Sequence, residues 1–366
     1  MSVGCRELIG FIEKRFPLEL QESFDNSGFL VGDEDRTINK ALVCLDVSLN
    51  VIEEAWEYGA DIIISHHPLI FTPLKSVKTS DMTGRCVMEL IKKNIALYSS
   101  HTSFDNSRGG MSHILAEMLE IKNTKILCNN HKERLLKIAV FVPESHEQEV
   151  RRAMLDAGAG HIGAYSHCSF NSSGTGTFLP LEGSAPYIGT KGRLEMVNEV
   201  KIEAIVQERL LNNIIESMLL SHPYEEPAYD IYPLKNSIEN GTGRFGELQE
   251  PMMLSKLAEK VKSVFNAPYV TIACEGDRLI RKAAVVGGSG MDFALDAVLK
   301  GCDVLITGDM KHHEALDAIA MGLCVIDPGH FYTENSAMPE LCRIIAEGLS
   351  IECKVAESGT SPFKLI

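Results

Sequence analysis

The stretch NKALVCLDVSLNVIEEAWEYGADIIISHHP (39–68) decides the fold class. It contains two short apolar segments, 39–46 and 60–65, that predict buried strands, and a helix between them over 48–59. Ser48 supplies an N-cap for this helix and Gly59 a C-terminal stop. Because apolar strands without polar alternation are covered on both faces, this order predicts an α/β sheet with helices on both sides.

The same pattern continues on both sides of this stretch. In the first part of the chain we expect a strand over 95–100 and helices over 5–14, 82–93 and 110–120. In the last part we expect strands over 282–288, 303–308 and 323–327, and helices over 252–264, 292–301, 310–321 and 333–347. The two outer parts, 1–129 and 246–366, are therefore predicted to be halves of one α/β domain.

The middle of the chain, 130–245, has a different order of elements. We expect a strand over 135–144, a helix over 146–158, two strands around a Gly/Ser loop within 160–180, a strand over 197–207, a helix over 208–223 and a strand over 228–234. The order β-α-β-β-α-β is the ferredoxin-like pattern, which predicts an inserted α+β domain. GTGRFGEL (241–248), with its three glycines, is expected to be the hinge that returns the chain to the core.

The composition is that of a globular protein of two or three domains, with 366 residues, 45% hydrophobic and 23% charged. No apolar stretch is long enough to span a bilayer, and the N-terminal segment lacks a signal-peptide pattern, so we predict a cytoplasmic protein without a membrane partner. The ten cysteines form no CxxC pair, which favours buried reduced thiols. A net charge of −15 argues against a nucleic-acid partner, since phosphate binding needs clustered lysines and arginines.

Metal-competent side chains follow three of the predicted strands. His66 and His67 directly follow one strand, Asp105 follows the next, and His330 and Glu334 follow the last. Ligands of open α/β sheets bind beyond the carboxyl ends of the strands, so we expect these ends to meet at one edge of one sheet. The adjacent histidines point in different directions and can serve two ions, whereas His330 and Glu334 share a helix face. Imidazoles and carboxylates without a thiolate suit Zn, Mn, Fe, Co or Ni better than Mg or Ca.

Each of these side chains also has a purely structural interpretation. A single histidine after a strand is more often a turn residue than a ligand, and His330 with Glu334 could simply start a helix. The joint placement at three strand ends favours a site. His101 is a weaker candidate, as a donor behind the ligands.

Two further segments have less specific signals. Asp309, His312 and His313 follow the strand 303–308 and could orient ligands or move protons, although His312 or His313 could equally lie on an exposed helix face. SFDNSGFLVG (23–32) contains a turn at Asp25 that either lines the cleft or is structural.

Several motifs carry a resemblance to a known family. They are SHHPLIF (65–71), SSHTSFDNSRGGMS (99–112), GRFGEL (243–248), VVGGSG (285–290), TGDMKHHEALDA (307–318) and GHFYTE (329–334). The chain resembles the Ngg1-interacting-factor-3-like family, whose members are described as homologues of the type 2 form of GTP cyclohydrolase I. GHIGAYSHCSF (160–170) and HPYEEPAYDIYPL (222–234) resemble the PII-like or CutA-like insert of the longer bacterial members.

The resemblance implies a duplicated three-layer αβα core, a dinuclear metal site and a ring-shaped homohexamer. Carried over by motif, the ligands are His66, His67, Asp105, His330 and Glu334, with Glu334 bridging. They would hold two divalent transition-metal ions per chain, with zinc favoured and Mn, Fe, Co or Ni as alternatives.

Two hypotheses of function follow. The first is a metal-dependent, GTP cyclohydrolase-like hydrolase that acts on a small molecule such as a nucleotide, with His101 or His312 moving protons. Opening of a purine ring and hydrolysis of a phosphoester or an amide are all compatible with this site. The second is a non-catalytic metal-binding or regulatory module that interacts with other proteins.

Overall fold

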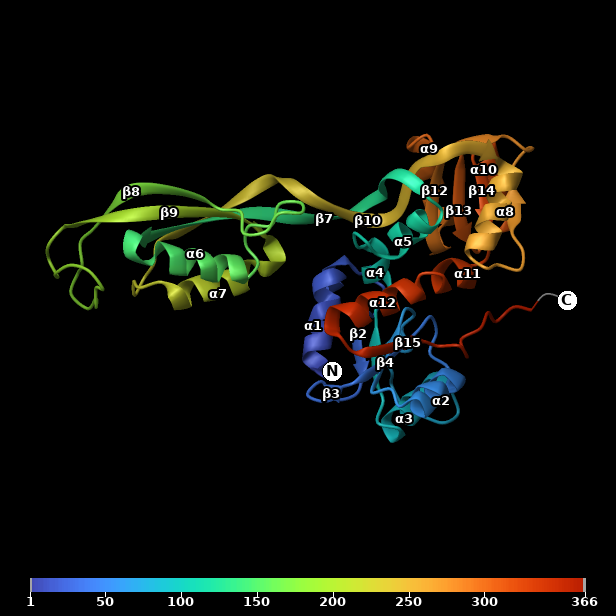
Figure 1. The fold of residues 1–366 in the computed structure, drawn as a ribbon, viewed down its shortest axis with the longest axis horizontal. Helices are drawn as coiled ribbons and strands as arrows, with labels where there is room; N and C mark the ends of the chain where they lie inside the picture. Colours follow the sequence, from blue (N-terminus) through green and yellow to red (C-terminus); the bar gives the residue numbers. More distant parts are fainter. Residues whose placement is uncertain (1, 365–366) are drawn as a thin grey trace. The chain divides into compact units, whose positions relative to one another are not determined.

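The computed structural model describes residues 2–364, apart from the side chain of Lys132. The chain has a mixed α/β structure that divides into two compact units (Figure 1). Unit 1 contains the described residues up to His131 and from Asn240 onward, and unit 2 contains Lys132–Glu239. No helix among the described residues is long and apolar enough to cross a membrane.

The first sheet of unit 1 is built around the strands of the 39–68 stretch. Its order is β15 (Glu352–Val355), β4 (Lys40–Cys44), β5 (Ile62–Ser65), β6 (Ala96–Ser99) and β2 (Gly28–Val31). The first four strands run parallel and β2 is antiparallel to β6. Cys44, Ser65 and Ser99 are register partners, so the carboxyl ends of the three central strands are level. A separate antiparallel pair is formed by β1 (Val3–Gly4) and β3 (Thr37–Ile38).

Unit 1 also contains part of a second sheet. Its order is β11 (Thr271–Ala273), β14 (Cys324–Asp327), β13 (Val304–Gly308), β12 (Leu279–Ser289), β10 (Tyr229–Met253) and β7 (Ile121–Pro143). β12, β13 and β14 are parallel, β11 is antiparallel to β14, and β10 is antiparallel to β12. The expectation that all three ligand-bearing strand ends lie on one edge of one sheet is therefore wrong. A short antiparallel strand lies at one edge of each sheet: β2 beside β6 in the first sheet, and β11 beside β14 in the second. These edge strands prevent the two sets of parallel strands from joining into one sheet.

Alternate residues of the parallel strands face two different cores. Ala41 and Val43 of β4 join the large core that both sheets share, whereas Leu42 and Cys44 face the opposite side. The shared core includes residues of α1 (Cys5–Arg15), α5 (Met111–Met118), α8 (Leu254–Val264) and α12 (Met338–Leu349). The outer face of the first sheet packs on α2 (Leu49–Tyr58) and α3 (Met82–Lys92), and that of the second on α9 (Ala294–Leu299) and α10 (His312–Ala320).

The caps predicted for the helix over 48–59, which is α2 in the structure, are confirmed. The Ser48 side chain accepts a hydrogen bond from the Val51 amide at the start of α2, and Gly59 ends the helix with a left-handed φ of 76°.

Unit 2 has the element order β7, α6 (Glu147–Asp156), β8 (Phe170–Phe178), β9 (Glu195–Gln207), α7 (Leu211–Ser221) and β10. The strands are ordered β10-β7-β9-β8, and β9 is antiparallel to both β7 and β8. The helices α6 and α7 lie side by side on one face of this sheet (Figure 1). Their apolar residues form a separate core with alternate residues of the strands, such as Val140 and Ile202. Single 3-10 turns, Glu144–His146 and Glu208–Leu210, precede the two helices.

Two local expectations, those for 160–180 and 333–347, are wrong. The segment 160–180 contains one strand, β8, because the small polar residues expected to form a loop pair with β9 along their whole length. The segment 241–248 lies within β10, directly after the boundary between the two units at Asn240, and an added Cβ at Gly246 would lie 2.2 Å from the Lys122 carbonyl oxygen, so close approach to β7 explains this glycine. The helix expected over 333–347 is two helices, α11 (His330–Asn335) and α12. Pro339 lies in the first turn of α12, where it can start a helix but cannot continue one.

Two cysteines also depart from the expected reduced state. Cys274 and Cys324 form a disulfide with a Cα–Cα distance of 4.8 Å. They meet because β11 and β14 are antiparallel neighbours, with Ala273 opposite Val325. The spacing of 50 residues gave no indication of this contact.

Candidate metal centre

Three loops of unit 1, each after the carboxyl end of a parallel strand, carry the candidate ligands. His66 and His67 directly follow β5. His101 and Asp105 follow β6 and lie at the start of α4 (Thr102–Asn106) and within it. His330 and Glu334 follow β14 and lie one turn apart in the short helix α11. The two sheets thus bring together residues that are up to 268 positions apart, since His66 and Glu334 lie 3.7 Å from each other.

Four imidazoles at this place are held in the same way, through their Nδ1 atoms. His66 Nδ1 lies 2.8 Å from the Ser100 carbonyl oxygen, His67 Nδ1 2.8 Å from Asp46 Oδ1, His101 Nδ1 2.7 Å from Asp25 Oδ1, and His330 Nδ1 2.7 Å from Asp309 Oδ2. A carbonyl oxygen and ionised carboxylates only accept hydrogen bonds, so each Nδ1 carries a proton and donates it. This fixes the tautomer and leaves the lone pair of each neutral imidazole on Nε2.

The Nε2 atoms of three of these histidines surround the carboxylate of Glu334. Glu334 Oε2 lies 2.9 Å from His67 Nε2 and 2.8 Å from His330 Nε2, and Glu334 Oε1 lies 3.7 Å from His66 Nε2. The Nε2 atoms of His67 and His330 are 3.4 Å apart. Asp105 Oδ1 lies 3.6 Å from His66 Nε2. His66, His67 and His330 are therefore brought together around the buried carboxylate of Glu334, which is only 4% exposed, and Asp105 joins them through His66.

This arrangement requires positive charge between the ligand atoms. Neutral imidazole lone pairs and a carboxylate oxygen repel one another at 2.8–2.9 Å unless a proton or a metal ion lies between them. Among the described side chains, His66 Nε2, Asp105 Oδ1 and Glu334 Oε2 are buried atoms without a partner in hydrogen-bond geometry. Unpartnered polar atoms of this kind are costly in a folded protein, and a bound cation would satisfy all three.

The pKa values of His67, His330 and Glu334 are shifted in the directions expected when imidazoles and carboxylates lie this close together. Burial opposes the charged form of His67, but Asp46 and Glu334 outweigh it and raise its pKa to about 10. Burial likewise opposes the charged form of His330, whereas Glu334 and Asp309 raise its pKa to about 9. Burial would raise the pKa of Glu334, but contacts with His330, His66 and His67 hold it well below its usual value. In the absence of metal, protons therefore take the place of the cation.

Two groups of ligand atoms are close enough to hold a metal ion. One consists of His66, His67 and His101, and the other of His67, His330 and Glu334, with the ligand atoms of each group within 4.8 Å of one another. His101 is thus a potential ligand itself, whereas we expected it to lie behind the ligands as a hydrogen-bond donor. Burial raises the pKa of Asp105, and a neighbouring cation would favour the charged form of this carboxyl.

One glycine makes room for the central carboxylate. Gly288, next to the last residue of β12, has a left-handed φ of 60°, and an added Cβ would lie 2.1 Å from Glu334 Oε1. The Gly288 amide also donates a hydrogen bond to the Thr333 hydroxyl, which joins this turn to α11. The glycine-rich turn 287–292 therefore has a role in shaping the site.

The remaining predicted polar residues fall into two classes. Asp309 contacts His330, as the expectation of an orienting group requires. His312 and His313 are exposed at the start of α10, where their rings contact each other 5.4 Å apart. His312 belongs to neither of the two groups of ligand atoms.

Sequence reasoning missed Asp46 and left the role of Asp25 open. Asp25 has a fully buried side chain and accepts hydrogen bonds from His101, from the Thr102 amide and hydroxyl, and from the Ser27 hydroxyl. Burial alone would raise the pKa of Asp25, but these donors lower it strongly. A signal for Asp46 existed, because it follows β4 at the level where His67 follows the neighbouring parallel strand β5.

A cavity of about 950 Å³ opens beside the centre and is lined by His67, His330, Asp46 and Asp309. Three aromatic side chains, Tyr269, Phe331 and Tyr332, and the C-terminal residues 361–364 form other parts of its wall.

Comparison with known proteins agrees with the motifs. Residues 3–362 match the family described as Duf34/NIF3 (NGG1p interacting factor 3). A protein of Halalkalibacterium halodurans named "GTP cyclohydrolase 1 type 2 homolog" is 45% identical over 88% of this chain and 87% of its own length. A Bacillus subtilis protein of the same name is 39% identical over 100% of this chain and 99% of its own. The crystal structure of a Bacillus cereus protein related to NIF3 superposes with a TM-score of 0.88 and 41% identity, covering 98% of both chains. The chain belongs to the Duf34/NIF3 family.

Proposed function

We propose that this chain is a metal-dependent hydrolase with a dinuclear centre. His66, His67, Asp105, His330 and Glu334 would hold two divalent transition-metal ions, with zinc favoured by the imidazole and carboxylate donors. The observation that carries the proposal is the convergence of three Nε2 lone pairs on one buried carboxylate, Glu334, with the unpartnered Asp105 oxygen beside one of these imidazoles, His66.

Glu334 is the proposed bridging ligand. Its Oε2 faces His67 and His330, whereas its Oε1 faces His66. Glu334 would therefore hold the ions together with His66, His67 and His330. His101 is available as an additional ligand or as the group that moves protons. His312, exposed at the start of α10, is the second proposed proton-transfer residue.

The chemistry supplied by two bound ions would be Lewis acidity and a water of lowered pKa. The protein's part is to hold the ligands ready. Asp46, Asp25 and Asp309 keep the imidazoles in the Nδ1–H tautomer and in a fixed orientation. Because Glu334 and the apolar core of unit 1 are buried, water can approach the ligand atoms from the cavity but not through the core.

The proposed substrate is a small molecule that enters the cavity beside the centre. Tyr269, Phe331 and Tyr332 offer ring faces and edges that suit a planar, partly apolar group. A nucleotide is the class to test first, in keeping with the name "GTP cyclohydrolase 1 type 2 homolog" of the relatives.

The test is turnover of a panel of nucleotides, phosphoesters and amides by protein loaded with Mn²⁺ or Zn²⁺. We expect His67→Ala to abolish turnover, because His67 belongs to both groups of ligand atoms. His161→Ala, which removes a histidine from the surface of unit 2, is the matched control and should leave turnover unchanged. Metal-loaded protein that turns over none of the panel would favour the second candidate, a non-catalytic metal-binding or regulatory module.

The domain plan and assembly are proposals as well. We infer a duplicated core, residues 1–129 and 246–366, since each half has three parallel strands in sequential order with an antiparallel strand beside the third. The strand order β10-β7-β9-β8 supports a ferredoxin-like, PII/CutA-like insert over 130–245. A ring-shaped homohexamer, as the family resemblance implies, would have six times the chain mass of 40.3 kDa in light scattering.

A further inference from the structure

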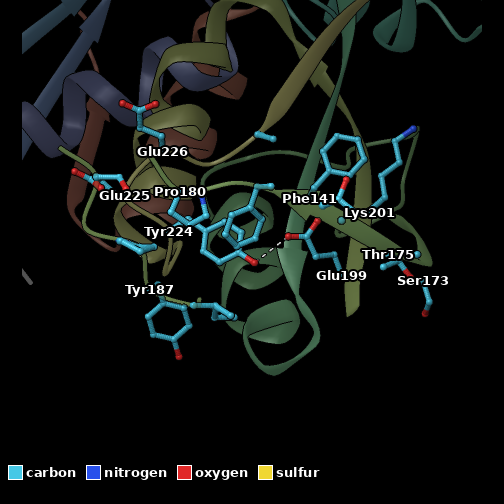
Figure 2. A pocket seen from close by; sticks show the side chains of 18 of the residues that line it. Phe141, Ser173, Thr175, Pro180, Tyr187, Glu199, Lys201, Tyr224, Glu225 and Glu226 are labelled. Carbon is cyan, nitrogen blue, oxygen red and sulfur yellow. Dashed lines mark hydrogen bonds between the residues drawn. The ribbon is translucent and has the colours of Figure 1, made fainter. Parts of the chain in front are cut away.

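Unit 2 contains a cavity that has no part in the metal centre. The helices α6 and α7 cover one face of its sheet, where Val140, Val142, Val200 and Ile202 are buried. The opposite face carries Phe141, Glu199 and Lys201, because side chains alternate along a strand. The loop 180–188, the segment 224–228 and β8 line a cavity of about 800 Å³ on this second face, which is open to solvent on one side (Figure 2).

The walls of this cavity are aromatic. Phe141, Phe178, Tyr187 and Tyr224 all line it. Phe178 and Tyr224 pack edge to face with ring centroids 5.8 Å apart, and Tyr187 lies 6.4 Å from Tyr224. Tyr187 is 54% exposed, so its ring stands at the edge of the cavity and no core depends on it.

A buried carboxylate forms part of the same wall. Glu199 of β9 is only 9% exposed, and its Oε1 accepts a hydrogen bond of 2.9 Å from the Tyr224 hydroxyl (Figure 2). Its Oε2 lies over Gly176 of β8, where an added Cβ would lie 2.1 Å away. The glycines and small polar residues of β8, which do not form a loop, thus leave a hollow that receives this carboxylate.

The segment that brings Tyr224 to Glu199 is held firmly. His222 Nε2–H donates to the Phe141 carbonyl oxygen at 3.0 Å, and His222 Nδ1 accepts from the Tyr224 amide at 3.1 Å. Glu225 Oε2 accepts from the Ala185 amide at 2.8 Å, which fixes the covering loop. The HPYEEP motif (222–227) is therefore explained as the frame of this cavity.

The charges favour a cation over an anion. Three carboxylates, Glu199, Glu225 and Glu226, line the cavity against one lysine. Lys201 is already engaged, since its Nζ lies 3.4 Å from Glu203 Oε1 and 5.9 Å from the Phe141 ring centroid. Electron-rich ring faces next to a buried carboxylate attract ammonium groups, and both attractions grow when water is excluded.

We propose that this cavity binds a small organic amine, with its ammonium group at Glu199 and its apolar part among Phe178, Tyr187 and Tyr224. The site is separate from the metal centre, and the proposal does not depend on any hydrolase activity. A cavity of this size accommodates a ligand of the dimensions of a typical metabolite.

The test uses three probes of one shape and different charge: phenethylamine, phenylethanol and phenylacetate. Binding to the full-length protein is measured by ligand-observed NMR titration. We expect phenethylamine to bind in the millimolar range, as such a small probe should, and the alcohol and the anion to bind at least tenfold more weakly. Glu199→Gln, which keeps an acceptor for Tyr224, should weaken amine binding at least tenfold.

Two controls locate the effect. Glu149→Gln removes the same charge from an exposed position on α6 and should leave amine binding unchanged. Tyr187→Leu removes a ring from the edge of the cavity and should weaken amine binding several-fold without lowering the Tm. Equal binding of the three probes, a preference for phenylacetate, or unchanged amine binding by Glu199→Gln would each overturn the proposal.

Discussion

The carboxylates behind the histidines offer the sharpest test of how the metal centre is organised. Asp46→Asn leaves a side chain of the same shape beside His67 but removes the charge that lies 2.8 Å from Nδ1. Losing such a partner behind a metal-bound imidazole typically lowers metal affinity by a factor of about 10–100. The Asp46 side chain is 58% exposed, so solvent already screens its charge and the low end of this range applies.

Asp25→Asn should have the larger effect if His101 is a ligand. The Asp25 side chain is 0% exposed, so solvent screens its charge on His101 less than it screens the charge of Asp46. We therefore expect zinc affinity to fall about tenfold for Asp46→Asn, or about 1.4 kcal/mol, and up to about a hundredfold for Asp25→Asn.

The assay is competition for Zn²⁺ with a chromophoric chelator at fixed pH and ionic strength. Asp317→Asn, at an exposed position on α10, is the matched control and should bind zinc like the unmodified protein. Far-UV circular dichroism identifies any variant that has lost its fold. If folded Asp46→Asn and Asp25→Asn both retain full affinity, the carboxylates do not orient ligands and the reasoning is refuted.

Three other perturbations follow from the structure. Gly288→Ala should lower the Tm and the metal content together, because its Cβ would lie 2.1 Å from Glu334 Oε1; retention of both values would contradict the close approach. Burial would raise the pKa of Glu54, but the 357 and 358 amides and Lys354 lower it to about 2, so its contribution to stability is complete above pH 4.5 and is lost as the pH falls towards 2. Glu54→Gln should therefore destabilise the chain by about 1–2 kcal/mol at pH 7 and speed up hydrogen exchange at residues 357 and 358. The stability difference from the unmodified protein should shrink in acid. A stability difference that does not change with pH would be contrary evidence. Replacing residues 132–239 with Asn-Gly should close β7 and β10 as a hairpin and leave unit 1 folded with its metal content, and an insoluble or metal-free product would show that unit 1 needs unit 2.

The strand ends were the informative part of the sequence. His66 and His67 could be predicted as ligands because an apolar strand followed at once by polar residues marks the carboxyl edge of an α/β sheet. The same logic predicted Asp309, which follows β13 beside β14, as an orienting residue. Applied to β4, it would also have found Asp46, which follows the strand beside β5.

What the sequence could not indicate were contacts that depend on pairing between distant strands. The candidate ligands come from two sheets. No pattern in the sequence near these strands shows that β4–β6 and β12–β14 lie in different sheets, each ending in an antiparallel edge strand. The small residues of β8 have the composition of a loop, yet backbone pairing with β9 makes them a strand. The role of Glu199 depends on the same pairing, which puts the carboxylate over Gly176.

The number of metal ions per chain tests the central claim most directly. Protein purified without chelator and reconstituted with Zn²⁺ should contain two ions per chain by elemental analysis. Glu334→Ala should retain at most one, because Glu334 faces His66 with one oxygen and His67 and His330 with the other. Unmodified protein that binds no transition metal after reconstitution, or Glu334→Ala that still binds two ions at full occupancy, would contradict the account.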